Sequence, residues 1–503
     1  MSTIGRRDFL TRAGAGALAL AAARRSTGQS ARDLPNILYI ICDDLGYGDV
    51  QCLNPEHGKI PTPHLDRLAS QGLVFTDCHG GSAVCTPTRY GVLTGRYCWR
   101  TRLQQGVLDS DTEPLIAPGR LTVPGLLRRH GYTTAAVGKW HLGYTFAREA
   151  GEAGGRAVGV GTRLVGGPTT RGFDSFYGFS HARAIQWLVT DDKIAEKVEA
   201  VDMLGLLTTR VKEYLARARQ AGRPFFCYWA LNSPHTPIVP TPAWQGKSGL
   251  NAYADFVMQT DAAIGEVLAA LQSEGLADNT LVVFTSDNGC SPAARIEELR
   301  RAGHEPSAQY RGYKADIWDG GHRIPFLVRW PGKVRAGGRS DQLLCLGDLL
   351  ATAADLVGTK LPANAGEDSF SFLGHLLGTG VSARRNLIHH SIQGRFAIRE
   401  ANWKLELCAG SGGWGSPNEQ AARREGLPGV QLYDLAHDVG EQHNVQAQHP
   451  ETVQRLTKLL VQQVAAGRST PGQPQANDRE IDVYKDGRRG QTNRNDPQAN
   501  AKE

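Results

Sequence analysis

The sequence predicts an α/β fold in which a large mixed, mostly parallel sheet is sandwiched by helices, with a smaller C-terminal subdomain. Apolar, strand-like runs alternate with amphipathic, helix-like segments, and this alternation stops at about residue 385. Polar clusters also follow directly after several of the strand-like runs. Because open α/β sheets bind ligands at the carboxyl ends of their strands, these clusters should converge on one site.

The alternation runs through most of the chain. Residues 35–42 form an apolar run, which predicts a buried parallel strand that ends at Asp43 and Asp44. Helical spacing follows at 63–72 and at 121–130, and glycine ends both segments. Further strands are expected at 132–137, 224–231 and 281–285, and further helices at 201–221 and 252–274.

The N-terminus accounts for most of the net charge of +6. The first 30 residues hold five arginines and one aspartate, and the remainder has 51 basic and 49 acidic residues, a net charge of +2. Such a small charge gives no reason to expect a nucleic-acid partner. Arg6 and Arg7 precede a weakly apolar stretch at 13–23, which is shorter than the roughly 20 apolar residues that span a bilayer.

This N-terminal pattern resembles a twin-arginine (Tat) export signal, and the alternative is a disordered basic tail. We therefore expect the Tat machinery as a partner, a periplasmic or secreted location and no membrane anchor. The nine cysteines form no C-x-x-C pair. Because a Tat substrate folds in the reducing cytoplasm, no dense disulfide framework is expected.

The C-terminal part of the chain has a different pattern of predicted secondary structure. Residues 397–407 and 430–435 predict short antiparallel strands, and 451–466 predict a closing helix. The sequence thus divides into an export signal at 1–30, an α/β domain with the candidate catalytic residues at 31–385, a C-terminal subdomain at 386–466 and a polar tail at 467–503. The low apolar content of the tail predicts a loose segment, either lying on the surface or disordered.

The most specific motif runs from Cys85 to Arg96 and reads Cys-Thr-Pro-Thr-Arg-Tyr-Gly-Val-Leu-Thr-Gly-Arg. A lone cysteine is usually a small buried residue. Here Cys85 begins a helical pattern, and a helix N-terminus favours an anion such as sulfate. The segment resembles the sulfatase signature C-x-P-x-R-x-x-x-L-T-G-R at every defined position. This resemblance, to the formylglycine-dependent, arylsulfatase A-like sulfatases of the alkaline phosphatase superfamily, covers about residues 35–465.

The resemblance implies that a formylglycine-generating or other sulfatase-maturing enzyme oxidises Cys85 to formylglycine. The hydrated aldehyde would attack sulfur and could later expel the sulfate by elimination, which an ordinary serine or cysteine cannot do. Arg89 could be a surface residue, but the resemblance makes it a fixed cation that hydrogen-bonds this hydrate.

Four oxygen-bearing side chains form a candidate metal site. Asp43 and Asp44 follow the first strand, and Asp287 and Asn288 follow the strand at 281–285. Adjacent carboxylates are usually a solvated turn, but at the end of a buried strand they would repel one another unless a cation lay between them. Three carboxylates and an amide oxygen suit Ca²⁺ or Mg²⁺ better than zinc. The resemblance assigns these residues to the metal, adds the formylglycine at Cys85 as a ligand, and favours Ca²⁺ over Mg²⁺.

Two histidines and a lysine follow two of the central strands. Lys139 and His141 are two residues apart, so an extended backbone would direct both to one side. By resemblance, Lys139 binds the sulfate, and His141 contacts the formylglycine and removes the proton whose loss expels sulfate. His235 would bind the substrate and stabilise or protonate the leaving oxygen.

The segment that begins at Lys314 resembles the sulfatase pattern K-x-x-x-x-E-G-G-x-R-x-P, which makes Lys314 a sulfate-binding residue. Asp319 stands where that pattern has Glu, at a position expected to support the loop. Ser180 matches a minor substrate-binding serine. Asp43 or Asp287 could act as base toward the attacking hydroxyl group.

The expected function is hydrolysis of sulfate monoesters, and export favours a sulfated carbohydrate as substrate. A phosphomonoester or phosphonate hydrolase is an alternative, because a cationic pocket treats phosphate and sulfate alike. A non-catalytic secreted glycan-binding protein is another. Trp140 and Trp318 lie next to proposed site residues and could stack on a sugar or pack in the core.

Overall fold

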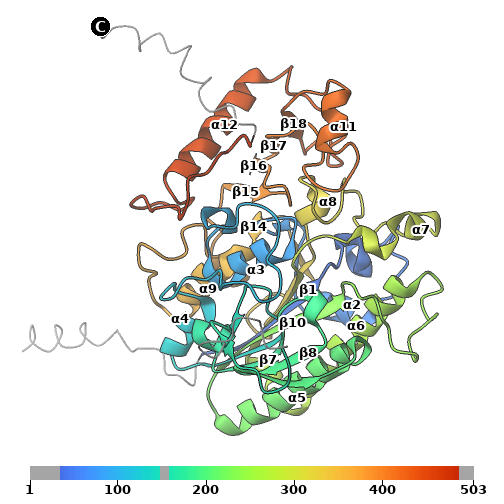
Figure 1. Ribbon diagram of the computed structural model, residues 1–503, viewed down its shortest axis with the longest axis vertical. Helices are drawn as coiled ribbons and strands as arrows, with labels where there is room; N and C mark the ends of the chain where they lie inside the picture. The colour runs from blue at the N-terminus through green and yellow to red at the C-terminus, as the bar shows by residue number, and fades with distance from the viewer. Residues whose placement is uncertain (1–33, 148–157, 486–503) are drawn as a thin grey trace, which may run out of the picture.

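The computed structural model describes residues 34–147 and 158–485. The predicted export signal at 1–30 and the end of the polar tail, 486–503, lie outside these residues. The large sheet and its helices form the main body, and the C-terminal subdomain lies at one end of it (Figure 1). Within the described ranges, no helix has both the length and the apolar character that crossing a bilayer requires.

The main sheet has ten strands in the order β13-β2-β12-β11-β1-β10-β4-β7-β8-β9. Its five central strands run parallel: β11 (Thr280–Ser286), β1 (Asn36–Asp43), β10 (Phe225–Pro234), β4 (Thr133–Lys139) and β7 (Ser175–Phe179). Antiparallel pairs flank them on both sides, through β12 (Phe326–Arg329) and β8 (Trp187–Thr190). The outermost strands are β2 (Leu73–Phe75), β13 (Gly338–Ser340) and β9 (Lys193–Lys197). The expected mixed, mostly parallel sheet is confirmed.

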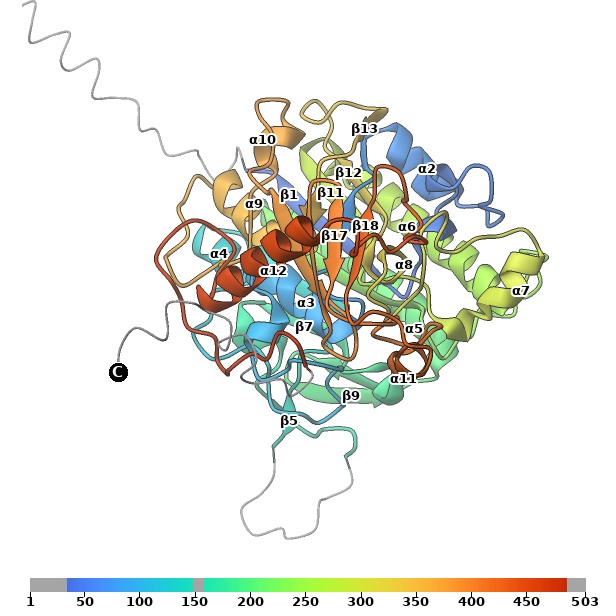
Figure 2. The ribbon, with the colours of Figure 1, turned by 90° about the horizontal axis from the view of Figure 1, so that it is seen from above.

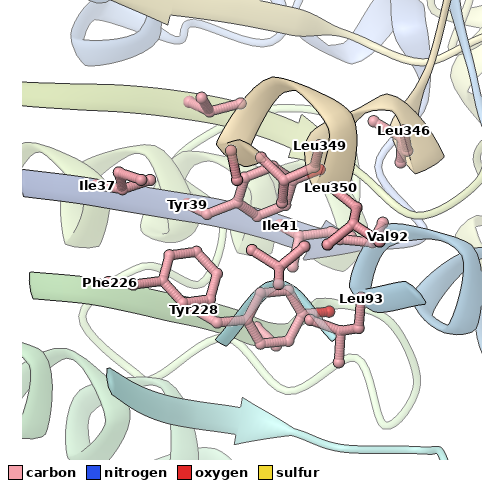
Figure 3. Close-up of a cluster of buried hydrophobic side chains, with 14 of the residues drawn as sticks. Ile37, Tyr39, Ile41, Val92, Leu93, Phe226, Tyr228, Leu346, Leu349 and Leu350 are labelled. Carbon is pink, nitrogen blue, oxygen red and sulfur yellow. The ribbon is translucent and has the colours of Figure 1, made fainter. Parts of the chain in front are cut away.

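The central strand β1 explains why the strand-like runs are continuously apolar. All eight of its residues are buried. Ile37, Tyr39 and Ile41 face one core, where they pack near Phe226 and Leu349 (Figure 3). Leu38, Ile40 and Cys42 face a second core on the other side. A strand buried on both faces has no polar side to alternate with its apolar one.

Helices cover both faces of the sheet. The core that contains Ile37 is closed by α3 (Cys85–Thr94), α4 (Val123–Arg129) and α9 (Leu349–Leu356). The core that contains Leu38 is closed by α2 (Pro63–Ser70), α5 (Met203–Ala221) and α6 (Ala252–Ser273). Four short helices are α7 (Ile296–Arg301), α8 (Asp319–His322), α10 (Leu373–Leu376) and α11 (Glu419–Arg424). Two small two-stranded sheets pair β3 (Cys78–His79) with β14 (Leu344–Cys345), and β5 (Thr145–Phe146) with β6 (Leu164–Val165).

The C-terminal subdomain is a four-stranded antiparallel sheet: β15 (Asn386–His390), β16 (Phe396–Glu400), β17 (Trp403–Glu406) and β18 (Gln431–Asp434). Helix α12 (Pro450–Ala465) packs on it through Leu456 and Leu460 (Figure 2). The expected short antiparallel sheet is confirmed. The segment predicted at 397–407 is two strands, because Ala401 takes a left-handed turn with φ of 51°, and β15 is an additional strand.

The described part of the tail, 467–485, contacts the body of the protein. Asp478 lies 3.1 Å from Arg96 of the cysteine motif, and Val483 is buried in the subdomain core. The tail therefore links the end of α3 to the C-terminal subdomain. All nine cysteines are free, consistent with the expected lack of a disulfide framework.

Candidate active site

The carboxyl ends of four neighbouring strands bring the predicted residues together. Asp43 ends β1, Lys139 ends β4, and His235 and Asp287 come directly after β10 and β11. The Nζ atom of Lys139 lies 2.7 Å from Oδ2 of Asp43 and 2.9 Å from Oδ1. The convergence expected from parallel strand direction is therefore present.

Cys85 is the first residue of α3 and is almost fully buried. Its Sγ lies 3.5 Å from Oδ1 of Asp43, to which the thiol can donate a hydrogen bond. Burial and the nearby Asp287 raise the pKa of the thiol, although Lys139 opposes this. A reactive cysteine needs a lowered pKa, so this site does not favour a thiolate nucleophile.

The four candidate metal ligands lie side by side and are completely buried or nearly so. The side-chain amide nitrogen of Asn288 donates to Oδ1 of Asp44 at 2.8 Å. The amide oxygen of Asn288 is buried and has no hydrogen-bond partner. Burial raises the pKa of Asp287, and the charge of Asp43 raises it further against the effect of Arg89. Crowded carboxylates and an unsatisfied amide oxygen are what a hard divalent cation would stabilise.

Three buried cations balance these carboxylates: Lys139, described above, Arg89 and Lys314. Arg89 donates to Oδ2 of Asp287 through Nε and Nη2 at 3.0 and 2.7 Å, and its Nη1 donates to the carbonyl oxygen of Lys139. Lys314 lies 2.7 Å from Asp44. Although burial opposes it, Asp44 raises the pKa of Lys314, so this lysine stays charged. The structure thus places Arg89 against a candidate metal ligand, Asp287. The predicted hydrogen bond of Arg89 to the aldehyde hydrate stays a prediction.

His141 is held in one tautomer and one backbone conformation. Its Nε2 lies 2.9 Å from the carbonyl oxygen of Leu108, so Nε2 carries the proton and Nδ1 is left buried and unpartnered. Its backbone has φ of 55°, a left-handed conformation that costs a non-glycine residue about 1–2 kcal/mol. The hydrogen bond from its N–H to Ser180 O, at 2.8 Å, helps to stabilise it. Burial, Lys139 and His181 lower the pKa of His141, so the ring is neutral.

His181 is a site residue that the sequence analysis did not single out. Its ring meets that of His141 edge-on, with centroids 4.4 Å apart. Burial, Lys139 and Arg183 lower its pKa to about 4. The only sequence signal was its place next to Ser180.

The remaining predicted residues differ in their exposure. His235 lies 3.5 Å from Oδ2 of Asp44, and 14% of its side chain is exposed, more than for any other residue of the cluster. Ser180 is buried, and its carbonyl oxygen supports His141. Trp140 and Trp318 are core residues whose indole N–H groups donate to Gly143 and Gln431, so neither is free to stack on a sugar.

The loop that carries Lys314 is supported from the C-terminal subdomain. Asp319 accepts hydrogen bonds from Lys404 of β17 at 2.8 Å and from Arg323 at 3.0 Å. This agrees with the supporting role expected for Asp319. Lys404 had no sequence signal, because it is 85 residues from Asp319 in the chain.

The fold and this site define a class of α/β protein that gathers carboxylates and buried cations at the carboxyl edge of its sheet. The family model for the sulfatases matches residues 35–359. The chain is 32% identical over 492 residues to the N-acetylgalactosamine-6-O-sulfatase of Bacteroides thetaiotaomicron. The aligned region covers 87% of this chain and 94% of that protein. It is also 32% identical over 465 residues to arylsulfatase A of Homo sapiens, with 84% and 87% covered.

The comparison with solved structures agrees. One solved structure, from work on the metabolism of multiple glycosaminoglycans by Bacteroides thetaiotaomicron, matches with a TM-score of 0.75 and 30% sequence identity. The match covers 85% of this chain and 99% of that one. The chain therefore belongs to the sulfatase family, as an arylsulfatase A-like sulfuric ester hydrolase.

Proposed function

We propose that this protein hydrolyses sulfate monoesters of a sulfated carbohydrate, with Cys85 matured to formylglycine and Ca²⁺ as the bound metal. The observation that carries the proposal is the position of Cys85. It lies at the N-terminus of α3, 3.5 Å from Asp43, in a cluster that also contains Lys139 and Lys314. The high pKa of its thiol supports a modified side chain as the nucleophile.

The metal would be held by Asp43, Asp44, Asp287 and Asn288, together with the modified Cys85. Their oxygen donors suit Ca²⁺ or Mg²⁺, and the resemblance to the sulfatases favours Ca²⁺. The unpartnered Oδ1 of Asn288 supports a cation at this point. Three carboxylates and one sulfate ester carry one more charge than the three buried cations balance, and a divalent ion would more than offset this difference. When present, the metal would withdraw charge from the sulfuryl oxygens, and the aldehyde hydrate would supply the attacking oxygen.

Two lysines would bind the sulfate. In the structure Lys139 donates to Asp43 and Lys314 donates to Asp44. Each ammonium group has three protons, so each can also donate to an incoming anion. Arg89 would hold Asp287 in place through its paired hydrogen bonds. Binding sites that are charged before the substrate arrives need little rearrangement as charge develops on the sulfate.

Three groups would handle protons. Asp43 is the carboxylate 3.5 Å from Sγ of Cys85, which favours it over Asp287 as the base toward the attacking hydroxyl. The free Nδ1 of His141 is an acceptor suited to the later removal of a proton. His235, the most exposed of the cluster, would donate toward the leaving alcohol, and Ser180 would assist binding.

The substrate class, the location and the partners of the protein are also inferences. The name of the Bacteroides relative, an N-acetylgalactosamine-6-O-sulfatase, supports a sulfated sugar. The twin arginines support export by the Tat machinery to the periplasm or beyond, after which the protein would meet such glycans. Maturation requires a formylglycine-generating or other sulfatase-maturing enzyme.

Mass spectrometry of the peptide that contains Cys85 tests the proposal, with protein from a host that carries the maturation enzyme. We expect an aldehyde at Cys85 in active protein, and turnover of a nitrophenyl sulfate well above that of the matching phosphate. A panel of defined sulfated saccharides then identifies the sugar. Fully active protein with an unmodified thiol would overturn the proposed nucleophile.

A further inference from the structure

The loop at 410–415, Gly-Ser-Gly-Gly-Trp-Gly, follows β17 and exposes a large aromatic side chain. Trp414 is 49% exposed, and it is the only aromatic residue among the large apolar side chains that are exposed in the described part of the chain. Leaving an indole in water forgoes the stabilisation that burial would provide. Single exposed apolar residues are common on protein surfaces, so the place of Trp414 in the fold decides whether it has a role.

The loop that presents Trp414 is tightly fixed. Oδ1 of Asp316 accepts hydrogen bonds from the backbone N–H groups of Trp414 at 2.9 Å and Gly415 at 2.8 Å. A Cβ atom at Gly413 would lie 2.3 Å from the carbonyl oxygen of Ala315, so only glycine fits there. Ser411 closes the loop by donating to Gly415 O. The backbone is rigid, whereas the side chain it carries faces solvent.

This loop is bonded to the segment that directly follows Lys314. Asp316 and Ala315 follow Lys314, whose Nζ is 2.7 Å from Asp44. Ala315 also donates to the carbonyl oxygen of Ala83, two residues before Cys85, at 2.8 Å. The hydroxyl of Tyr313 donates to the carbonyl oxygen of Trp414 at 3.2 Å. The sequence neighbours of Lys314 thus hold the loop that carries Trp414.

We propose that Trp414 is a platform on which a sugar ring of the substrate stacks while its sulfate group lies at Cys85. Pyranose rings present an apolar face of C–H groups, with their hydroxyls at the edge, and a flat, rigid indole matches such a face with little loss of conformational entropy. The inference rests on the proposed function, because it requires a carbohydrate sulfate. It assigns part of the substrate specificity to the C-terminal subdomain.

The test uses matured, Ca²⁺-loaded protein with Trp414 changed to Ala or Phe. The matched control is Trp403→Ala, which changes a partly buried tryptophan at the first residue of β17, where it packs on His449. Each variant is assayed with the sulfated saccharide that the parent hydrolyses fastest. Inhibition by inorganic sulfate, which needs only the anion site, is measured in parallel, together with the thermal unfolding midpoint.

Trp414→Ala should raise KM for the saccharide about tenfold, a loss of about 1.4 kcal/mol of binding. It should leave the inhibition constant of inorganic sulfate and the unfolding midpoint unchanged. Trp414→Phe should recover most of the affinity, and Trp403→Ala should leave KM for the saccharide at the parent value.

An unchanged KM in Trp414→Ala would overturn the platform while leaving the sulfatase assignment intact. An equal loss of saccharide and inorganic sulfate binding would also overturn it, because the loop would then be structural only. A parent enzyme that hydrolyses aryl sulfates but no sulfated saccharide would overturn both the proposed substrate class and this inference.

Discussion

The ring of His141 donates its Nε2 proton to the carbonyl oxygen of Leu108 at 2.9 Å, and this single bond determines which ring nitrogen carries the proton. The remaining nitrogen, Nδ1, is buried, unprotonated and unpartnered. Burial and the charge of Lys139 lower the pKa of the ring, which keeps it an acceptor at neutral pH.

Replacement of His141 by Ala should therefore lower kcat by about 10²–10⁴-fold, the usual contribution of a positioned acid or base. KM should change little, because the proposed sulfate-binding residues, Lys139 and Lys314, are unchanged. Steady-state kinetics of matured protein measure both constants. His437→Ala is the control, since that side chain is 84% exposed. A kcat within about tenfold of the parent would exclude His141 from proton transfer.

Lys314 should act mainly on anion binding. Loss of a charge-assisted hydrogen bond is worth about 1.5–3 kcal/mol, so Lys314→Ala should raise KM and the inhibition constant of inorganic sulfate by about tenfold or more. The exposed Lys333 provides a control with the same change of charge. If Lys314→Ala binds inorganic sulfate as tightly as the parent, the lysine only neutralises Asp44.

Removal of the proposed Ca²⁺ should affect stability as well as activity. A ligand that binds only the folded state raises its stability, so chelation should lower the thermal unfolding midpoint and Ca²⁺ should restore it. Asn288→Ala removes the unpartnered amide oxygen and should weaken the dependence of the midpoint on Ca²⁺ concentration.

The exposed Asn364 supplies a matched control for this change, since Asn364→Ala should respond to Ca²⁺ as the parent does. Calorimetry gives the affinity directly, without reference to turnover. A midpoint that is insensitive to both chelation and Ca²⁺ would argue against a bound metal.

Much of the site could be predicted because its signals are local. Asp43 and Asp44 directly follow an apolar run, and Asp287 follows another, so strand direction alone brings them to one edge. The Cys85 motif is contiguous in sequence. Helix ends were predicted to within a few residues, as for 201–221, which is observed as Met203–Ala221.

The features that were missed depend on contacts between distant segments. Lys404 contacts Asp319 across 85 residues, and Asp478 contacts Arg96 across 382 residues. The break at Ala401 is a left-handed turn at a residue type that gives no warning of it. Neither helical spacing nor strand alternation carries information of this kind, because both describe only near neighbours.

A buried histidine cluster joins the two parts of the protein. His79 and His322 of the main domain contact through their Nδ1 atoms at 3.0 Å, and the ring of His389, from β15, lies over His322 with centroids 3.6 Å apart. All three rings are fully buried, and neither nitrogen of His389 has a hydrogen-bond partner. The charged groups around them are Asp77, Asp319, Arg323, Arg399 and Lys404.

Burial lowers the pKa of all three histidines, and Lys404 lowers it further for His322 and His389, while Asp77 opposes the shift at His79. In the unfolded chain they titrate near pH 6.5. Below that pH the unfolded state binds more protons than the folded state, so stability falls as the pH is lowered. Each histidine contributes up to about 1.4 kcal/mol per pH unit to this loss of folding stability.

His389→Leu should therefore flatten the loss of stability between about pH 6.5 and 5, while leaving the protein at least as stable at neutral pH. Leucine is apolar and of similar size, and His389 makes no hydrogen bond that would be lost. Urea unfolding at a series of pH values measures the slope, with the exposed His437→Leu as control. Equal acid slopes in the parent and His389→Leu would show that the cluster protonates without opening, because the carboxylates of Asp77 and Asp319 would then stabilise the charged rings in place.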